Sequence, residues 1–158
     1  NIQVNFNDKN KNDIFRAKTI GIVYQQNNLL PDFTALENLY LASLSINDNK
    51  KMAMLKAEKL LKKIGLSSRS DHFPSQLSGG ESQRVAIARA IINDPDIILA
   101  DEPTGSLDMK TAKDIFALLN NQKKRNRLII FATHNRFFAK KADYLLELTN
   151  GSIKSTNV

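Results

Sequence analysis

Three short apolar runs separated by polar segments predict the strands of one sheet. They are residues 20–23, 97–100 and 128–132, and each is rich in isoleucine or valine. The run at 97–100 is typical of a central parallel strand buried on both faces, and the run at 128–132 is expected to be buried as well. Alternating apolar and polar residues at 2–6 predict an edge strand that continues into a polar loop at 7–13.

Apolar residues three and four positions apart predict helices between these strands. Thr34 followed by Glu37 is the pattern of a capping box, which starts a helix. Asn47 and Asp48 are expected to cap the next helix, and Gly65 to end it. The apolar face of that helix consists of Ala53, Ala57, Leu60, Leu61 and Ile64.

Shorter elements are expected near both ends of the chain. Residues 14–18 and 136–141 predict short helical segments. Residues 144–148 and 152–154 flank Asn150-Gly151, which is typical of the turn of a β-hairpin.

The stretch LSGGESQR at residues 77–84 starts a strongly helical run that ends near Asn93. Ser78 can cap the helix with its hydroxyl, and Gly79 and Gly80 let bare backbone approach a ligand. Free N–H groups at the positive end of a helix dipole suit a phosphate. The simpler interpretation is a Ser-Gly-Gly turn without a ligand, which the residues that follow argue against.

Polar residues follow each of the three predicted parallel strands. Asp101 and Glu102 end the run at 97–100, His134 comes just after the run at 128–132, and Gln25 just after the first run. Ligands of open α/β sheets bind beyond the carboxyl ends of the strands, so the two carboxylates fall where a magnesium nucleotide would lie. Alone, Gln25 would be a loop amide and His134 a structural histidine.

Taken in order, these motifs resemble those of ABC ATPases. LSGGESQRVAIARA resembles the signature, IILADEP the Walker B motif and TGSLD the D-loop. GIVYQQNNLLPDFTALENL resembles the Q-loop region, particularly that of the lipoprotein-releasing and macrolide-export subfamily.

The resemblance implies an α/β fold with a P-loop NTPase-like core of parallel strands and an inserted α-helical subdomain. Residues 1–33 would hold N-terminal strands and the Q-loop, and residues 34–76 the helical subdomain. Residues 77–158 would hold the signature, Walker B, D-loop, switch histidine and C-terminal hairpin.

The resemblance also implies ATP and Mg²⁺ as cofactors and a role for each residue near the strand ends. Glu102 would activate the attacking water, and Gln25 and His134 would position the water and the terminal phosphate. Asp101 would hold magnesium, with Gln25 as a second contact.

Other residues would act across a dimer. In this family the signature of one subunit binds the nucleotide held by the other, so a homodimer or paired subunits sandwich ATP. The residues implied at that contact are Ser78, Gly79, Gly80, Glu81 and Asp108. As pure structure, Asp108 is expected to cap the helix that follows.

Composition narrows the possible partners. The chain has no cysteine, which excludes disulfides and thiolate metal sites, and no apolar run near the roughly 20 residues that span a bilayer. Its net charge of +7 is scattered and not interleaved with aromatic residues, so nucleic acid is not expected. The resemblance instead implies contact of the Q-loop region with integral membrane permease subunits, and a peripheral location on the cytoplasmic face of the cell membrane.

An ABC-type ATPase of DNA repair or chromosome organisation remains the alternative, since it shares these motifs. Such proteins commonly insert coiled coils or zinc modules between Q-loop and signature, whereas this interval is compact and lacks cysteine. A non-catalytic regulatory homologue is a third interpretation, against which Glu102 and His134 argue.

No phosphate-binding loop of the form G-x-x-x-x-G-K-[ST] occurs among the six glycines. Because the family places that Walker A loop before the Q-loop, the N-terminal part of the domain is expected to lie outside this sequence. The 158-residue chain is therefore expected not to hydrolyse ATP alone.

Overall fold

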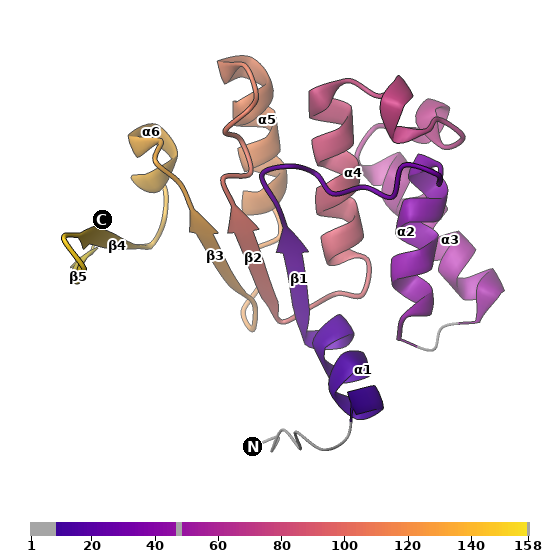
Figure 1. Ribbon diagram of the computed structural model, residues 1–158, viewed down its shortest axis with the longest axis horizontal. Coiled ribbons are helices and arrows are strands. Elements are labelled where there is room, and N and C mark those ends of the chain that lie inside the picture. The colour runs from indigo at the N-terminus through magenta and orange to yellow at the C-terminus, as the bar shows by residue number, and fades with distance from the viewer. Residues whose placement is uncertain (1–8, 47–48, 158) are drawn as a thin grey trace.

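The computed structural model describes residues 9–46 and 49–157 (Figure 1). The α-helices are α1 (Lys9–Thr19), α2 (Ala35–Leu44), α3 (Lys50–Lys63), α4 (Gly79–Ile91), α5 (Met109–Asn120) and α6 (Arg136–Ala139). The short 3₁₀ helices are η1 (Ser67–Arg69) and η2 (Pro74–Gln76). The strands are β1 (Ile20–Val23), β2 (Ile97–Asp101), β3 (Leu128–Ala132), β4 (Tyr144–Thr149) and β5 (Ser152–Asn157).

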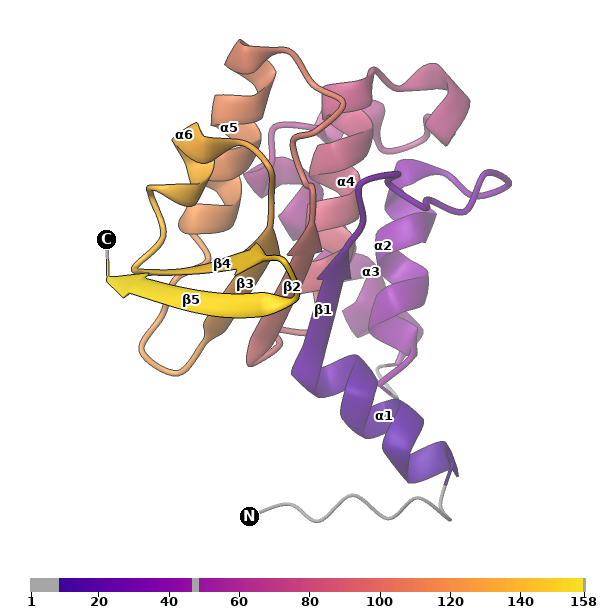
Figure 2. The same ribbon diagram turned by 60° about the vertical axis from the view of Figure 1, so that its left-hand side comes forward.

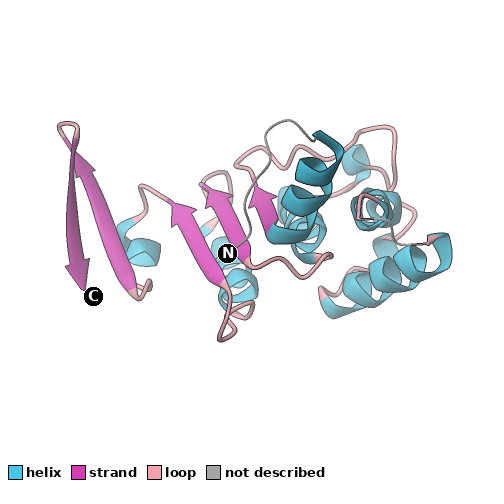
Figure 3. Ribbon diagram, turned by 90° about the horizontal axis from the view of Figure 1, so that it is seen from below, coloured by secondary structure: helices cyan, strands magenta, loops and turns pink. Residues whose placement is uncertain are grey.

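Strands β1, β2 and β3 form a parallel sheet in that order, so β2 is the central strand, as predicted. Ala100 is paired with Val23 on one side and with Phe131 on the other. The carboxyl ends of all three strands therefore meet at one edge of the sheet. The predicted hairpin is present as the separate antiparallel pair β4–β5 (Figures 2 and 3).

Helices α4 and α5 cover one face of the parallel sheet. The buried residues of this core are Val23, Ile87, Ile91, Ile98, Ala100, Ile115 and Leu119. The opposite face is open, because Leu128 is 55% and Ile130 51% exposed, and Leu99 is only partly buried. The predicted burial of 97–100 on both faces and of 128–132 is therefore wrong for the described residues, which place no helix over the second face.

A second core joins α2 and α3 to α4. Its buried residues are Ala35, Leu39, Ala57, Leu61, Ile64, Leu66, Val85, Ala88 and Ile92. Helix α4 contributes to both cores, with Val85 and Ala88 facing α2 and α3 and Ile87 facing the sheet. The helix that starts at the signature therefore mechanically links the sheet to the helical pair.

Of helices α2 and α3, the first is capped by the predicted residues and the second is not. The capping box of Thr34 and Glu37 is confirmed at the start of α2. The cap of α3 is Asn49, whose side chain accepts a hydrogen bond from the Met52 N–H, rather than the predicted residues 47–48, which lie outside the described residues. Gly65 follows that helix with a φ of 74°, as a terminating glycine does.

The N-terminal segment differs from the prediction. The predicted strand at 2–6 lies outside the described residues, but the loop expected at 7–13 is wrong from Lys9 onward, where α1 begins. An ion pair between Asp13 and Arg16, one turn apart, favours a helix here, and Arg16 lies near its carboxyl end, where cations are favourable. Among the described residues, no helix has the length and apolar character needed to cross a membrane.

Gly21 brings β1 close to the end of α4. A Cβ atom at this position would lie 2.1 Å from the carbonyl oxygen of Ala90 and 3.1 Å from Cγ of Pro95. We expect Gly21→Ala to lower the free energy of unfolding by about 1–3 kcal/mol, because backbone atoms would have to move apart. Urea unfolding measures this loss.

The matched control for that variant is Gly151→Asn in the β4–β5 turn. Nothing lies within 4 Å of a Cβ atom there, and asparagine tolerates the φ of 74°. Equal unfolding midpoints for Gly21→Ala and the parent protein would show that β1 and α4 can separate without cost.

Candidate functional site

The N-terminus of α4 is built as a reciprocal cap. Ser78 has an extended backbone and its hydroxyl accepts a hydrogen bond from the Glu81 N–H at 3.3 Å. Glu81 returns the interaction, since its Oε2 accepts from the Ser78 N–H at 2.8 Å. The predicted start of the signature helix is confirmed, and the glutamate in the motif acts as the capping partner.

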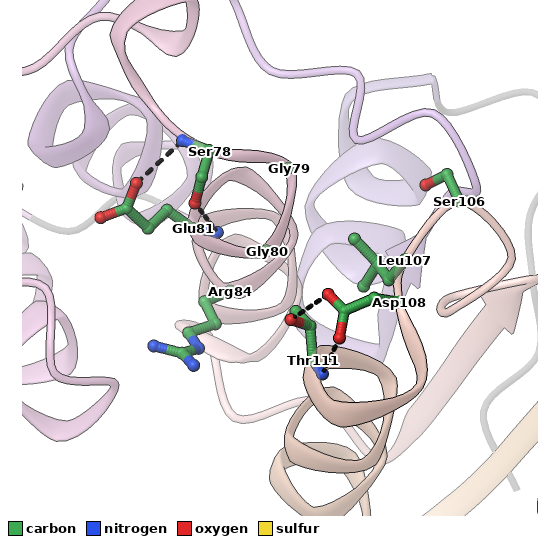
Figure 4. Close-up of a pocket in the computed structure, with 9 residues that line it drawn as sticks. All are labelled: Ser78, Gly79, Gly80, Glu81, Arg84, Ser106, Leu107, Asp108 and Thr111. Atoms are coloured by element: carbon green, nitrogen blue, oxygen red, sulfur yellow. Dashed lines mark hydrogen bonds between the residues drawn. The ribbon is translucent and has the colours of Figure 1, made fainter.

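A hollow of about 600 Å³ opens beside this cap (Figure 4). Its lining residues are Ser78, Gly79, Gly80, Glu81, Arg84, Ser106, Leu107, Asp108 and Thr111. The first N–H groups of a helix have no partner within the helix, so this end of α4 can donate hydrogen bonds into the hollow. Arg84 adds a positive charge, which suits an anion.

Gly80 also has a packing role that the sequence did not indicate. A Cβ atom on it would lie 2.5 Å from Cγ2 of Thr111, whereas a Cβ atom on Gly79 would lie at an ordinary 3.6 Å from Cδ2 of Leu107. Gly80 therefore allows the first turns of α4 and α5 to approach each other, which brings the signature and the D-loop to one hollow.

Both carboxylates at this hollow are held by neighbouring donors. Hydrogen bonds from Ser78 hold the pKa of Glu81 below its usual range, and Arg69 contributes to the same shift. Bonds from the hydroxyl and N–H of Thr111 lower the pKa of Asp108. Asp108 caps α5, as predicted from sequence, and accepts from Thr111 Oγ1 at 2.6 Å.

The carboxyl ends of β2 and β3 form a second cluster around Glu102. Its Oε1 accepts from the His134 N–H at 2.7 Å and lies 2.7 Å from Nδ1 of the same histidine. Its Oε2 accepts from the hydroxyl of Thr133 at 3.2 Å. Glu102 has a φ of 42° and a side chain that is 17% exposed, while His134 is 79% exposed. The structure thus brings together two residues that are 32 positions apart.

Gln25 lies beside the turn that follows Glu102. Its Nε2 is 3.4 Å from the position that a Cβ atom would take on Gly105. Asp101 is exposed at the end of β2, next to Ala132 in the strand register. The predicted residues from three strand ends therefore share one edge of the sheet.

This donor set fits magnesium but would not bind a metal tightly alone. Among the described residues, no group of three or more histidine, cysteine, aspartate or glutamate side chains could hold an ion. Magnesium usually takes one or two carboxylates and completes its shell with phosphate oxygens and water. Asp101 with the amide oxygen of Gln25 is a suitable partial shell for magnesium that arrives with a nucleotide.

Three residues at these sites escaped the sequence interpretation. Thr133 had a recognisable signal, because its hydroxyl comes directly before His134 at a strand end. Arg69 and Arg89 had none, since Glu81, which pairs with Arg69, and the backbone partners of Arg89 are 12 or more positions away in sequence. Arg89 donates to the carbonyl oxygens of residues 27 and 28, at 2.9 and 2.6 Å, and so ties the segment after Gln25 to α4.

The chain matches known proteins over most of its length. Residues 1–105 match the family model described as ABC transporter. The chain is 45% identical over 148 residues to the lipoprotein-releasing system ATP-binding protein LolD of Rickettsia bellii (strain RML369-C), covering 93% of this chain and 67% of that protein. It is 45% identical over 142 residues to LolD 2 of Chlorobaculum tepidum (strain ATCC 49652 / DSM 12025 / NBRC 103806 / TLS), covering 89% of this chain and 58% of that protein.

Solved structures agree with these relatives. The dimeric post-hydrolysis state of the ATP-binding cassette MJ0796 bound to ADP and Pi superposes with a TM-score of 0.84 at 36% identity, covering 99% of this chain and 70% of the other. The chain spans about two thirds or less of the length of the two curated relatives named above. With its α/β fold and its parallel sheet, it belongs to the ABC transporter family of ATP-binding cassette proteins.

Proposed function

We propose that this chain is part of the ATP-binding and ATP-hydrolysing subunit of an ABC transporter that powers lipoprotein release or a related export process. The observation that carries the proposal is the Glu102 cluster, in which a carboxylate at a strand end is held by Thr133 and His134. The relatives named as parts of lipoprotein-releasing systems support the choice of process.

Glu102 is the general base in this proposal. Its two oxygens are oriented by the His134 N–H and the Thr133 hydroxyl, so the carboxylate is directed before substrate arrives. It accepts the proton of the attacking water. An imidazolium at His134 would donate from Nδ1 to Glu102 and from its other ring nitrogen to the terminal phosphate of ATP.

Asp101 and Gln25 hold Mg²⁺, and the ion, when bound, neutralises charge on the phosphates. The Gln25 amide carries both a donor and an acceptor, so it can orient the attacking water as well as contact the ion. Gln25 lies beside Gly105, at the same edge of the sheet as Glu102.

The signature residues act on the nucleotide of a second subunit. Neither Glu102 nor His134 lines the hollow at Ser78, so one chain presents its catalytic carboxylate and its signature at different places. A head-to-tail dimer would place Ser78 and the N–H groups of Gly79 and Gly80 against the terminal phosphate held by the partner. The dimeric cassettes of similar structure support this assembly.

Permease subunits dock near the Q-loop, at the cytoplasmic face of the membrane. Leu30 and Phe33 expose apolar surface there, although the backbone around them is held firmly. The buried amide of Asn38 donates to the carbonyl oxygens of Leu30, Phe33 and Thr34. A firmly held apolar surface suits transmission of motion to a protein partner.

Assays of the complete subunit test this function. Magnesium-dependent ATP hydrolysis and co-purification with a membrane permease are expected, and salt-dependent DNA affinity is not. Tight DNA binding without permease association would favour the DNA-repair or chromosome-organisation class. Absence of ATP hydrolysis in the presence of magnesium would remove the proposed enzymatic role.

The 158-residue chain by itself is expected to show no ATP turnover. It contains no G-x-x-x-x-G-K-[ST] frame, so it lacks the backbone cradle and the lysine for the phosphates. Phosphate release by the purified chain, with magnesium and ATP, measures this directly. Sustained turnover that disappears in a Glu102→Gln form of the same chain would contradict the expectation.

A further inference from the structure

Arg69 lies outside the motifs of the proposed chemistry, yet it is joined to the signature by an ion pair. Its Nε donates to Oε1 of Glu81 at 3.0 Å, and the two side chains are 42% and 22% exposed. The other oxygen of Glu81 accepts from the Ser78 N–H. Both oxygens of this carboxylate therefore serve to hold protein groups in place.

The same guanidinium also faces the helical pair. Nη1 of Arg69 lies 3.1 Å from Nε2 of His72, which must accept the hydrogen bond, because a guanidinium only donates. The carbonyl oxygen of His72 accepts from the Ala35 N–H at 2.8 Å, at the first residue of α2. Arg69 thus connects the start of α2 to the start of α4.

Glu81 links Arg69 to the phosphate-facing backbone, because it contacts both Arg69 and Ser78. Its carboxylate holds the Ser78 N–H, and the Ser78 hydroxyl holds the Glu81 N–H, so the cap geometry depends on where the Glu81 side chain points. That geometry sets the directions of the N–H groups of Gly79 and Gly80. Arg69 limits the rotation of Glu81 through a charge-assisted hydrogen bond.

We propose that Arg69 is a positioning residue for the signature motif, which holds Glu81 in the capping conformation and so preorganises Ser78, Gly79 and Gly80 for the partner's nucleotide. The proposal rests on the function proposed above, in which the signature acts across a dimer. It adds a residue that lies outside the lining of the hollow.

A double-mutant cycle in the complete subunit tests this role. Glu81→Gln keeps an amide oxygen for the Ser78 N–H but removes the charge that attracts Arg69. Arg69→Ala is expected to raise the KM for ATP and weaken ATP-dependent dimerisation by about three- to tenfold, with kcat at saturating ATP nearly unchanged. In the Glu81→Gln background, Arg69→Ala should cause little further change in the KM for ATP or in dimerisation. Arg69→Lys should recover part of the loss.

Amide hydrogen exchange of the nucleotide-free protein gives a readout independent of activity. Arg69→Ala should speed exchange in peptides covering residues 77–85 and leave β2 unchanged. Lys123→Ala is the matched control, because it also removes one ion pair. The pair of Lys123 with Asp143 is 3.0 Å long, is more exposed than that of Arg69 with Glu81, and lies outside residues 77–85. The control should behave as the parent in every assay.

Additive effects of Arg69→Ala and Glu81→Gln, or unchanged exchange at 77–85, would overturn the role of Arg69. A parent subunit that binds and hydrolyses no ATP would instead overturn the proposed function. The two failures are distinguishable, because the exchange comparison uses protein without nucleotide and needs no turnover.

Discussion

Glu102→Gln in the complete subunit is expected to lower kcat by about 10²–10⁴-fold, the usual contribution of a general base. Glutamine keeps the size of the side chain and an oxygen that can accept from the His134 N–H or the Thr133 hydroxyl. It cannot accept the proton of the attacking water. ATP binding should survive, so phosphate release and nucleotide binding must be measured on the same preparation.

The same variant is expected to form an ATP-bound dimer that persists. Removing a negative charge beside the terminal phosphates eases their repulsion, while loss of hydrolysis leaves the nucleotide that bridges the subunits intact. Size-exclusion chromatography with magnesium and ATP would show the dimer. Glu58→Gln, on an exposed face of α3, is the matched control and should dissociate after turnover as the parent does.

Two outcomes would contradict different parts of this expectation. Hydrolysis at the parent's rate would mean that Glu102 is not the general base, and the assignment would move to His134. Loss of hydrolysis without a stable dimer would leave the catalytic role intact and contradict the sandwich arrangement.

Ser78→Arg is expected to reduce turnover at least about a hundredfold while nucleotide binding to the isolated subunit is kept. The substitution removes the helix cap and fills the hollow at α4 with a long side chain. ATP held elsewhere on the same subunit would be unaffected, because Ser78 meets the partner's nucleotide. Ser152→Arg, on the exposed strand β5, is the control for an added charge.

Mixing the two inactive variants separates action across the dimer from action within one chain. Consider a dimer of one Ser78→Arg subunit and one Glu102→Gln subunit. If the signature acts on the partner's nucleotide, one of the two sites combines the wild-type Glu102 of the first subunit with the wild-type Ser78 of the second. If the signature acts within its own chain, both sites carry a substitution. Random pairing should then recover roughly a quarter of the parental rate, if the two sites act independently. No recovery, with mixed dimers shown to form, would contradict the trans assignment.

Much of the local structure was predictable because it depends on neighbouring residues. The capping pairs Thr34–Glu37 and Ser78–Glu81 span one helical turn each, so their spacing is visible in the sequence. The apolar run that became β2 and the carboxylates that follow it were visible for the same reason. The helix at residues 9–19 was predicted only over 14–18, because residues 9–13 are all polar and show no apolar periodicity.

The sequence by itself determined the types of most elements, their order and the motifs that identify the family. Only the tertiary structure decided which side chains meet: Glu102 with Thr133 and His134, and Arg69 with Glu81. It also decided that one face of the sheet is covered and the other open. These contacts join residues from 12 to 32 positions apart, so they depend on how strands and helices pack, which no local pattern of residues encodes.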